Sequence, residues 1–522
     1  MQHPAQDLGQ VARRLHPLWL LVLFLAFGFL IAMFVSSLSG PNSDGVLLAA
    51  VGILVAIPGV VLLLKAFPQG LEKARMLSKN WTWWHLLWFL TYFSTLVFRI
   101  RDVSEAKGNP LDAWALTRVL PEAFVSLALI VRLVLRRPNW LRSLFTGIPG
   151  LMSIYCLVCL VSSLWSVNAS WTAYKSLEFL ADVSLIAAIV ASAEGSQTYQ
   201  NLLDWTLAFY GFSLVGVWIN VPLFPVDAWD GGRLSGVVPV EASNSIGTYG
   251  GVLALVAICR LWPMEGKARS RAWYIFVFIL GMVSMVLSQT RNAEAAFALG
   301  LLLIALFMPR VRRIAVVGAL AGLPLLAAFM LLAHNLWEKA GQLVLTFAER
   351  DQSAGALDSL SGRTAWWAYG MEQLSQHPWT GLGAYAAGRF AVLGKLGVGY
   401  AAMMHSDWIE VLIGTSFWGV IPFLGALLAA WWFLIQCVRS TSYTAAQRQL
   451  AVECLALLGM LTVHSFFNDE LSWHCPLLYF AILGYAEFAR TQARAEAEYD
   501  HLRQPANHFA NSFAVSLNRS SL

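Results

Sequence analysis

Two arginines of this sequence are candidates for binding a phosphate group. Arg233 lies in the run Gly232-Arg233-Leu234-Ser235-Gly236, and Arg291 ends the run Ser288-Gln289-Thr290-Arg291. A guanidinium is planar and permanently charged, and it can bind phosphate oxygens through two parallel hydrogen bonds. A lone arginine next to an apolar segment is often only an interfacial anchor. Position alone leaves both interpretations open.

A histidine supplies the candidate for acid–base chemistry. His405 precedes an amphipathic segment in which Ser406 or Asp407 can cap a helix. The positive end of a helix dipole disfavours imidazolium, so a neutral, basic imidazole is expected at this position. A capping or interfacial histidine is the alternative interpretation.

The remaining ionisable groups are weaker candidates. Arg363, with Asp358 nearby, is a candidate for a polar contact with substrate. Four carboxylates are expected to lie on solvated faces rather than to act as secondary acids: Asp407, Glu410, Asp469 and Glu470. Cys156 and Cys159 form a CxxC inside an apolar run, which favours buried thiols over redox or metal chemistry.

The motifs of several enzyme classes are absent from the sequence. It contains no HxH, HExxH or paired-carboxylate pattern, which argues against a metal site. It also lacks a Walker A motif, a GxSxG elbow and a dinucleotide fingerprint, so no cofactor is expected. No basic stripe suggests nucleic acid. Any group that the chain transfers should therefore come from a preactivated donor resident in the membrane.

The composition predicts that these residues are positioned by membrane-spanning helices. The 522 residues are 58% hydrophobic and only 12% charged, whereas soluble chains carry roughly 25% charged residues. A spanning helix needs ~20 mostly apolar residues because lipid offers the backbone no hydrogen-bond partner. We expect an all-α, polytopic protein with about fourteen spans, near residues 18–38, 45–64, 83–100, 117–135, 145–165, 175–192, 201–221, 243–262, 272–289, 292–308, 313–334, 414–436, 448–467 and 474–488.

The charges of the predicted loops indicate an orientation. With the N-terminus in the cytoplasm, sixteen basic residues fall in cytoplasmic loops, whereas the outer loops hold few apart from Arg99, Arg101 and Lys107, as the positive-inside rule requires. The sixteen cytoplasmic residues are Lys65, Lys73, Arg75, Lys79, Arg136, Arg137, Arg142, Arg260, Lys267, Arg269, Arg271, Arg310, Arg312, Arg313, Arg439 and Arg448. Arg233, Arg291 and His405 then face the opposite, periplasmic side of an inner membrane, and both termini are cytoplasmic.

The chain divides into five predicted regions. They are an N-terminal transmembrane bundle (1–230), helices with the arginine motifs (231–334), a periplasmic loop region (335–413), C-terminal transmembrane helices (414–489) and a cytoplasmic tail (490–522). In the loop region, Ser361 and Gly362 can begin a helix that ends at His377-Pro378, and Gly381-Leu382-Gly383 turns the chain. The helix that begins near His405 is expected to lie on the membrane surface.

The order of these motifs resembles the O-antigen ligase and polymerase superfamily of bacterial membrane glycosyltransferases. The resemblance covers roughly residues 230 to 475. It rests on the two arginine runs, on Ser361-Gly362-Arg363, on His377-Pro378-Trp379-Thr380-Gly381-Leu382-Gly383 and on His405-Ser406-Asp407-Trp408-Ile409-Glu410. The sequence departs from the family pattern at Glu241-Ala242-Ser243-Asn244, where Pro-Asn is frequent, and at Ser406, where Asn is frequent.

The resemblance implies an undecaprenyl-diphosphate-linked oligosaccharide as donor and a sugar hydroxyl as acceptor. Arg233 and Arg291 would bind the diphosphate without a metal ion, Arg363 would contact substrate, and His405 would be the general base. The size of the chain favours a polymerase of O-antigen or exopolysaccharide repeat units. The partners would include an acceptor glycan or lipid A-core, and a chain-length regulator or export machinery.

Other functions compete with the polymerase. An O-antigen ligase would transfer the glycan to lipid A-core in lipopolysaccharide biosynthesis, and a protein O-oligosaccharyltransferase would use Ser or Thr. A transporter of an anion or a lipid-linked sugar is the main alternative outside the enzymes. Transporters often show internal repeats with broken helices at the midplane, and this sequence shows no repeat. A structural scaffold of an envelope complex is the last alternative.

Overall fold

The computed structural model describes residues 45–79, 81–99, 112–136, 140–266, 270–317, 362–398, 403–472 and 476–495. Within these ranges the chain is largely helical, which confirms the predicted all-α class. The predicted span 18–38, most of the span 313–334, residues 335–361 and the tail beyond 495 lie outside the described residues, as do Asp358 and Ser361.

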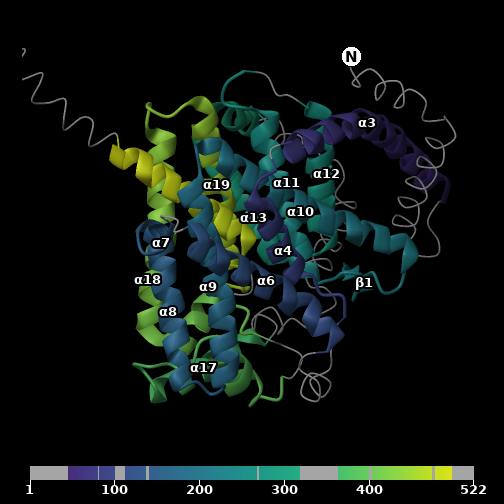
Figure 1. The fold of residues 1–522 in the computed structure, drawn as a ribbon. Helices are drawn as coiled ribbons and strands as arrows, with labels where there is room; N and C mark the ends of the chain where they lie inside the picture. The colour runs from purple at the N-terminus through teal and green to yellow at the C-terminus, as the bar shows by residue number, and fades with distance from the viewer. Residues whose placement is uncertain are drawn as a thin grey trace, which may run out of the picture.

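Figure 1 shows the described helices, several of which are joined by short connections. They are α3 (Gly45–Lys79), α4 (Trp83–Thr95), α6 (Ala113–Arg136), α7 (Trp140–Leu144), α8 (Gly147–Val161), η1 (Ser162–Leu164), α9 (Ala169–Ser192), α10 (Ser196–Leu223), α11 (Ser243–Leu261), α12 (Arg271–Leu287), α13 (Arg291–Phe307), α17 (Arg363–Gln376), the π-helical turn η2 (Ala387–Leu393), α18 (Asp407–Arg439) and α19 (Ala445–His464). A last helix covers residues 477–495.

Four of the described helices are long and apolar enough to cross a membrane. They are the stretch Gly147–Leu164 and helices α10, α11 and α18. A fifth is reached if α13 and the helix Pro309–Val317, which meet at 115°, count as one broken span. The predicted count of fourteen is not confirmed. Helix α9 shows one reason. It is 24 residues long, but it contains three buried charged residues, Lys175, Glu178 and Asp182, and is therefore not among the candidate spans.

Helices α11 and α12 pack with their backbones almost in contact. A Cβ atom on Gly250 would lie 2.4 Å from the carbonyl oxygen of Gly281, and one on Gly281 would lie 2.5 Å from that of Gly250. Small residues at such a crossing let helices approach closely in lipid, where van der Waals packing drives association. The two glycines therefore allow the close approach of α11 and α12 at this crossing.

We expect Gly250→Ala to destabilise the protein. The added methyl group meets backbone atoms that cannot rotate away, and overpacking of this kind costs about 1–3 kcal/mol. The measurement is thermal unfolding in detergent. Gly211→Ala on α10 is the matched control, because a Cβ at that position meets nothing within 4 Å. Equal melting temperatures for the two variants would contradict the tight crossing.

Two short hairpins that the sequence did not predict precede α11. Strands β1 (Trp229–Asp230) and β2 (Arg233–Leu234) pair in antiparallel register, with Asp230 opposite Arg233. The connecting Gly231 and Gly232 have φ of 56° and 77°, the left-handed conformation that a two-residue hairpin turn requires. Strands β3 (Gly236–Val237) and β4 (Val240–Glu241) form the second hairpin. Arg233 is thus placed at a fixed point directly after a tight turn.

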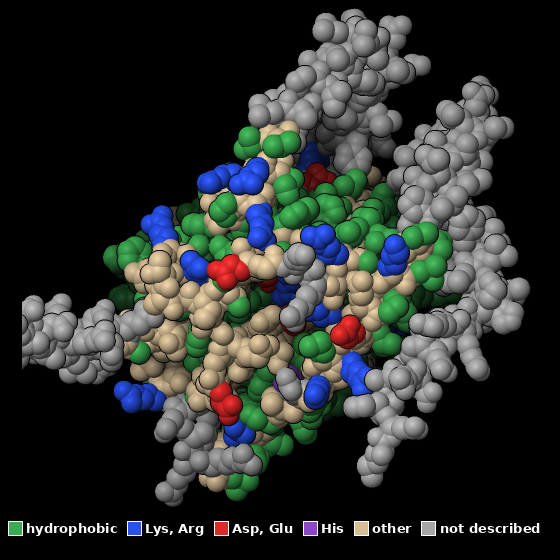
Figure 2. All heavy atoms as spheres, turned by 90° about the horizontal axis from the view of Figure 1, so that it is seen from above, with side chains coloured by type: hydrophobic (Ala, Val, Ile, Leu, Met, Phe, Trp, Pro, Cys, Tyr) green, Lys and Arg blue, Asp and Glu red, His purple; other side chains and the backbone are tan. Residues whose placement is uncertain are grey.

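The basic residues gather at the end of the molecule opposite α17. Lys and Arg side chains are spread over this face and are more numerous there than Asp and Glu (Figure 2). Helix α18 ends with Arg439 in its last turn, and α11 ends with Arg260. A 19-residue helix such as α11 is about 28 Å long, so its two ends reach opposite sides of an apolar layer.

Candidate functional site

Arg233 is fixed between three elements. Its Nε donates a hydrogen bond to the carbonyl oxygen of Ser288 at 3.0 Å, and its Nη2 donates to Asn244 Oδ1 at 2.9 Å and to Thr290 Oγ1 at 3.3 Å. These partners belong to the α12–α13 turn and to the first turn of α11. Such contacts hold the guanidinium rigidly, as charge recognition in a fixed geometry requires.

Arg291 lies close to Arg233 at the start of α13. Burial lowers the pKa of Arg233, the charge of Asp230 opposes that shift, and the positive charge of Arg291 adds to it. The turn before Arg291 is strained, because Gln289 has a φ of 48°. Two like charges held together in this way are compensated most simply by an anion.

Arg363 is the first residue of α17 and joins the same cluster. The preceding Gly362 has a φ of 85°, and α17 ends at Gln376 before His377, as the sequence predicts. Arg363 Nη1 donates to the carbonyl oxygen of Phe467 at 2.5 Å. Burial lowers the pKa of Arg363, the charge of Asp469 opposes this, and the charge of Arg233 adds to it. Arg363 is therefore within electrostatic reach of Arg233.

His405 completes the cluster. It has a φ of 53°, its ring stacks on Trp366 with centroids 6.3 Å apart, and its Nδ1 lies 3.3 Å from Asn468 Oδ1. Burial, and then the charge of Arg363, lower the pKa of His405 to about 4. The imidazole is neutral, as the sequence predicts. The cause differs from the helix dipole named above, because burial and Arg363 are the dominant effects.

The structure thus brings together all four candidates, Arg233, Arg291, Arg363 and His405, from four separate segments. Strained backbone at Gln289 and His405 lies within this cluster, and such outliers concentrate at functional sites. Among the residues that the structure describes, no group of three or more His, Cys, Asp or Glu side chains is placed to hold a metal ion.

Asp407 corrects one sequence-based expectation. Its side chain is buried rather than solvated. The carboxylate accepts hydrogen bonds from the backbone N–H groups of Glu470, Leu471 and Ser472 at 2.7–2.9 Å, and from the Ser472 hydroxyl at 2.5 Å. Asp407 therefore holds the loop of residues 465–472 against the start of α18. Residue type alone suggested solvent, but four donors make burial of this carboxylate possible.

The first turns of α18 are buried against the rest of the protein as well. The placement of this helix on the membrane surface stays a prediction. Glu410 is 3% exposed, and its Oε2 accepts a hydrogen bond from the backbone N–H of Met404 at 3.3 Å. Ser406 caps the helix by accepting from Ile409 N–H, which confirms one of the two predicted caps. The helix is interrupted at Ser416, which has φ 54° and ψ −150°.

The Gly381-Leu382-Gly383 turn is attached to this interruption. The N–H group of Leu382 donates to the carbonyl oxygen of Ile413 at 2.9 Å, and the N–H group of Gly383 donates to that of Gly414 at 2.9 Å. Gly381 and Gly383 have φ of 65° and 98°, which explains the two glycines of the motif. The turn predicted from the sequence is confirmed, and it is also a structural link between the loop region and α18.

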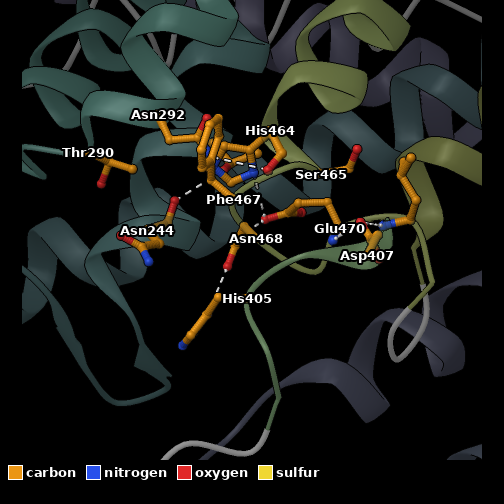
Figure 3. A network of polar contacts seen from close by, with 12 residues as sticks. Asn244, Thr290, Asn292, His405, Asp407, His464, Ser465, Phe467, Asn468 and Glu470 are labelled. Atoms are coloured by element: carbon orange, nitrogen blue, oxygen red, sulfur yellow. Dashed lines mark hydrogen bonds and ion pairs between the residues drawn. The ribbon is translucent and has the colours of Figure 1, made fainter. Parts of the chain in front are cut away.

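A chain of polar contacts runs from His405 to the Arg291 turn (Figure 3). Asn468 Oδ1 faces His405, and Asn468 Nδ2 donates to Glu470 Oε1 at 2.8 Å. Glu470 Oε1 lies 3.2 Å from His464 Nδ1, and the carbonyl oxygen of His464 accepts from Asn292 Nδ2 at 3.1 Å. Asn468 and Asn292 were not predicted as site residues. The signal was a polar run after an apolar span, Asn468-Asp469-Glu470.

These features define a class of protein: a bundle of apolar helices with arginines and a neutral histidine clustered at the end away from its basic face. Residues 274–424 match a family model described as O-antigen ligase, so this segment is similar to that family. The predicted resemblance to the O-antigen ligase and polymerase superfamily is confirmed. No curated protein matches the chain.

The family match bears on the coarse function. It supports a membrane enzyme of the glycosyl-transferring, O-antigen ligase type, and the family implies a lipid-linked glycan donor and an acceptor. The matched segment contains Arg291, Arg363 and His405. Arg233 and the loop of residues 465–472 lie outside it. The cluster therefore joins the matched segment to helices on either side of it.

Proposed function

We propose that this chain transfers a glycan from an undecaprenyl-diphosphate-linked donor to a sugar hydroxyl at the periplasmic face of the inner membrane, polymerising O-antigen or exopolysaccharide repeat units. The observation that carries the proposal is the convergence of Arg233, Arg291 and Arg363 beside a neutral His405. Half-buried cations in this number favour an anionic partner, and a neutral imidazole has a free lone pair that can accept a proton.

In the proposed reaction, the acceptor hydroxyl oxygen attacks the anomeric carbon of the donor sugar. The bond between that carbon and the diphosphate oxygen breaks, and its electron pair leaves with the lipid diphosphate. The hydroxyl proton passes to His405, which later releases it to water. The arginines stabilise the negative charge that grows on the leaving oxygen, a form of electrostatic stabilisation that costs no reorganisation when the donors are held in advance.

The position of the cluster supports the proposed orientation. Helices α11, α13 and α18 begin at the site, whereas α12 and α19 end there. Their other ends carry Arg260, Arg271, Arg310, Arg439 and Arg448. Under the positive-inside rule that basic end faces the cytoplasm, and the site faces the periplasm. A preactivated lipid-linked donor suits that side of the membrane.

A second candidate is transfer of the glycan to lipid A-core. The description of the matching family model, O-antigen ligase, favours it. Both reactions use the same donor chemistry and differ in the acceptor hydroxyl.

The experiment that separates these functions uses purified protein and a defined lipid-linked oligosaccharide, with and without lipid A-core. A product ladder from donor alone supports polymerisation. One shifted band that requires lipid A-core would replace the polymerase by a ligase. Uptake of the lipid-linked sugar into proteoliposomes, without a new glycosidic bond, would overturn the glycosyltransferase and favour a transporter.

We expect glycan transfer to continue in the presence of a chelator, because three arginines supply the positive charge that a metal ion provides in other phosphate-transforming sites. The measurement compares initial rates before and after treatment with EDTA. Loss of activity that Mg²⁺ restores would contradict a reaction driven by the arginines alone.

A further inference from the structure

The contacts of Asn468 decide which of its amide atoms faces His405. Its two polar neighbours are the His405 ring at 3.3 Å and the Glu470 carboxylate at 2.8 Å. The Glu470 Oε1 atom accepts the hydrogen bond from the NH₂ group of the Asn468 amide. The carbonyl oxygen of Asn468 then faces His405. The opposite amide orientation would set two acceptors against each other.

The orientation of the amide determines the tautomer of the histidine. An amide oxygen only accepts, so the His405 Nδ1 that faces it carries the hydrogen. In a neutral imidazole the other nitrogen, Nε2, then holds the free lone pair. A hydrogen bond to one ring nitrogen is the general means by which proteins choose the nitrogen that reacts.

We propose that Asn468 and Glu470 are positioning residues that hold His405 as the Nδ1–H tautomer, so that Nε2 takes the proton of the acceptor hydroxyl. This inference rests on the proposed function. Glu470 orients the amide, the amide orients the ring, and Asp407 holds the loop on which both residues lie. The contacts of Glu470 with His464, and of His464 with Asn292, connect the base to the turn that carries Arg291.

The charges that face His405 come from two packed elements. From α17, Arg363 lowers the pKa of His405. From the loop 465–472, Asp469 faces the backbone N–H of His405, but burial and the neighbouring carboxylates raise the pKa of Asp469 well above its usual range. This shift favours the neutral form of Asp469 and so weakens the negative charge that it sets against Arg363. The neutral amide of Asn468 keeps the ring oriented without adding negative charge.

The test is the pH profile of kcat/KM for Asn468→Asp. In the wild-type protein we expect the neutral imidazole to be the active form, so activity should fall as the pH drops through about 4. A carboxylate bonded to Nδ1 stabilises the imidazolium, and we expect the acid limb to move upward by about 1 to 2 pH units. Glu265→Gln is the matched control, because this exposed carboxylate lies at the opposite end of the molecule, 3.8 Å from Arg448.

A second variant tests the contact between Glu470 and Asn468. In Glu470→Gln the residue at 470 can donate as well as accept, so the Asn468 amide can turn over, and we expect a kcat about 10-fold lower with KM unchanged. The proposed positioning of His405 by Glu470 and Asn468 would be overturned by either of two results. One is a pH profile of Asn468→Asp whose acid limb coincides with that of the wild-type protein, and the other is a wild-type kcat in Glu470→Gln. Absence of transfer in folded wild-type protein would instead overturn the proposed function.

Discussion

Replacing His405 by alanine is expected to lower kcat for glycan transfer by about 10²–10⁴-fold, the range that a positioned general base contributes. The acceptor hydroxyl then has no group to take its proton as the new bond forms. Binding of the lipid-linked donor should change little, because the arginines remain. The measurement is single-turnover transfer with purified protein, together with donor binding.

Two comparisons make the His405 result specific. His377 lies at the end of α17 on an exposed turn, so His377→Ala should keep wild-type kcat. Melting temperatures of both variants show whether the fold is intact. A folded His405→Ala variant that transfers glycan at the wild-type rate would remove His405 from the mechanism.

Replacing Arg233 by alanine is expected to lower kcat/KM for the donor by about 10²–10³-fold, the usual effect of removing one group that stabilises charge in the transition state. Lysine should restore little of this activity. Arg233 makes three hydrogen bonds through two nitrogens, and a lysine ammonium lacks the planar geometry to repeat them while facing a phosphate.

Arg312→Ala is the matched control for Arg233, because Arg312 is an exposed cation on the helix Pro309–Val317, beyond α13. The measurement is the rate of transfer over a range of donor concentrations. Full activity of Arg233→Lys would indicate that a simple point charge suffices at this position. Equal losses in the Arg233 and Arg312 variants would indicate a non-specific effect of surface charge.

Local signals in the sequence predicted part of this structure well. Gly362 and the His377-Pro378 pair set the ends of α17, because both act through the backbone of their immediate neighbours. The residue types of Arg233, Arg291 and His405, in their order along the chain, led to the family that the comparison confirmed. Counting spans predicted only that the three residues lie on the same side of the membrane, because an even number of crossings returns the chain to that side.

Other features depended on partners that are distant in the sequence. Asp407 is buried because the backbone N–H groups of residues 470–472 donate hydrogen bonds to it. The residues next to Asp407 in the sequence do not predict these donors. The contact between Asn468 and His405 joins residues 63 positions apart. The hairpins β1–β2 and β3–β4 have strands of two residues, too short for any alternation of polar and apolar side chains.

The hydrogen bonds between the Gly381-Leu382-Gly383 turn and the interrupted part of α18 have a consequence for how the protein moves. Segments that share backbone hydrogen bonds tend to open together as one cooperative unit. The amides of Leu382 and Gly383 should therefore exchange with solvent as slowly as those of the adjoining helix. This end of the molecule should therefore behave as a rigid frame.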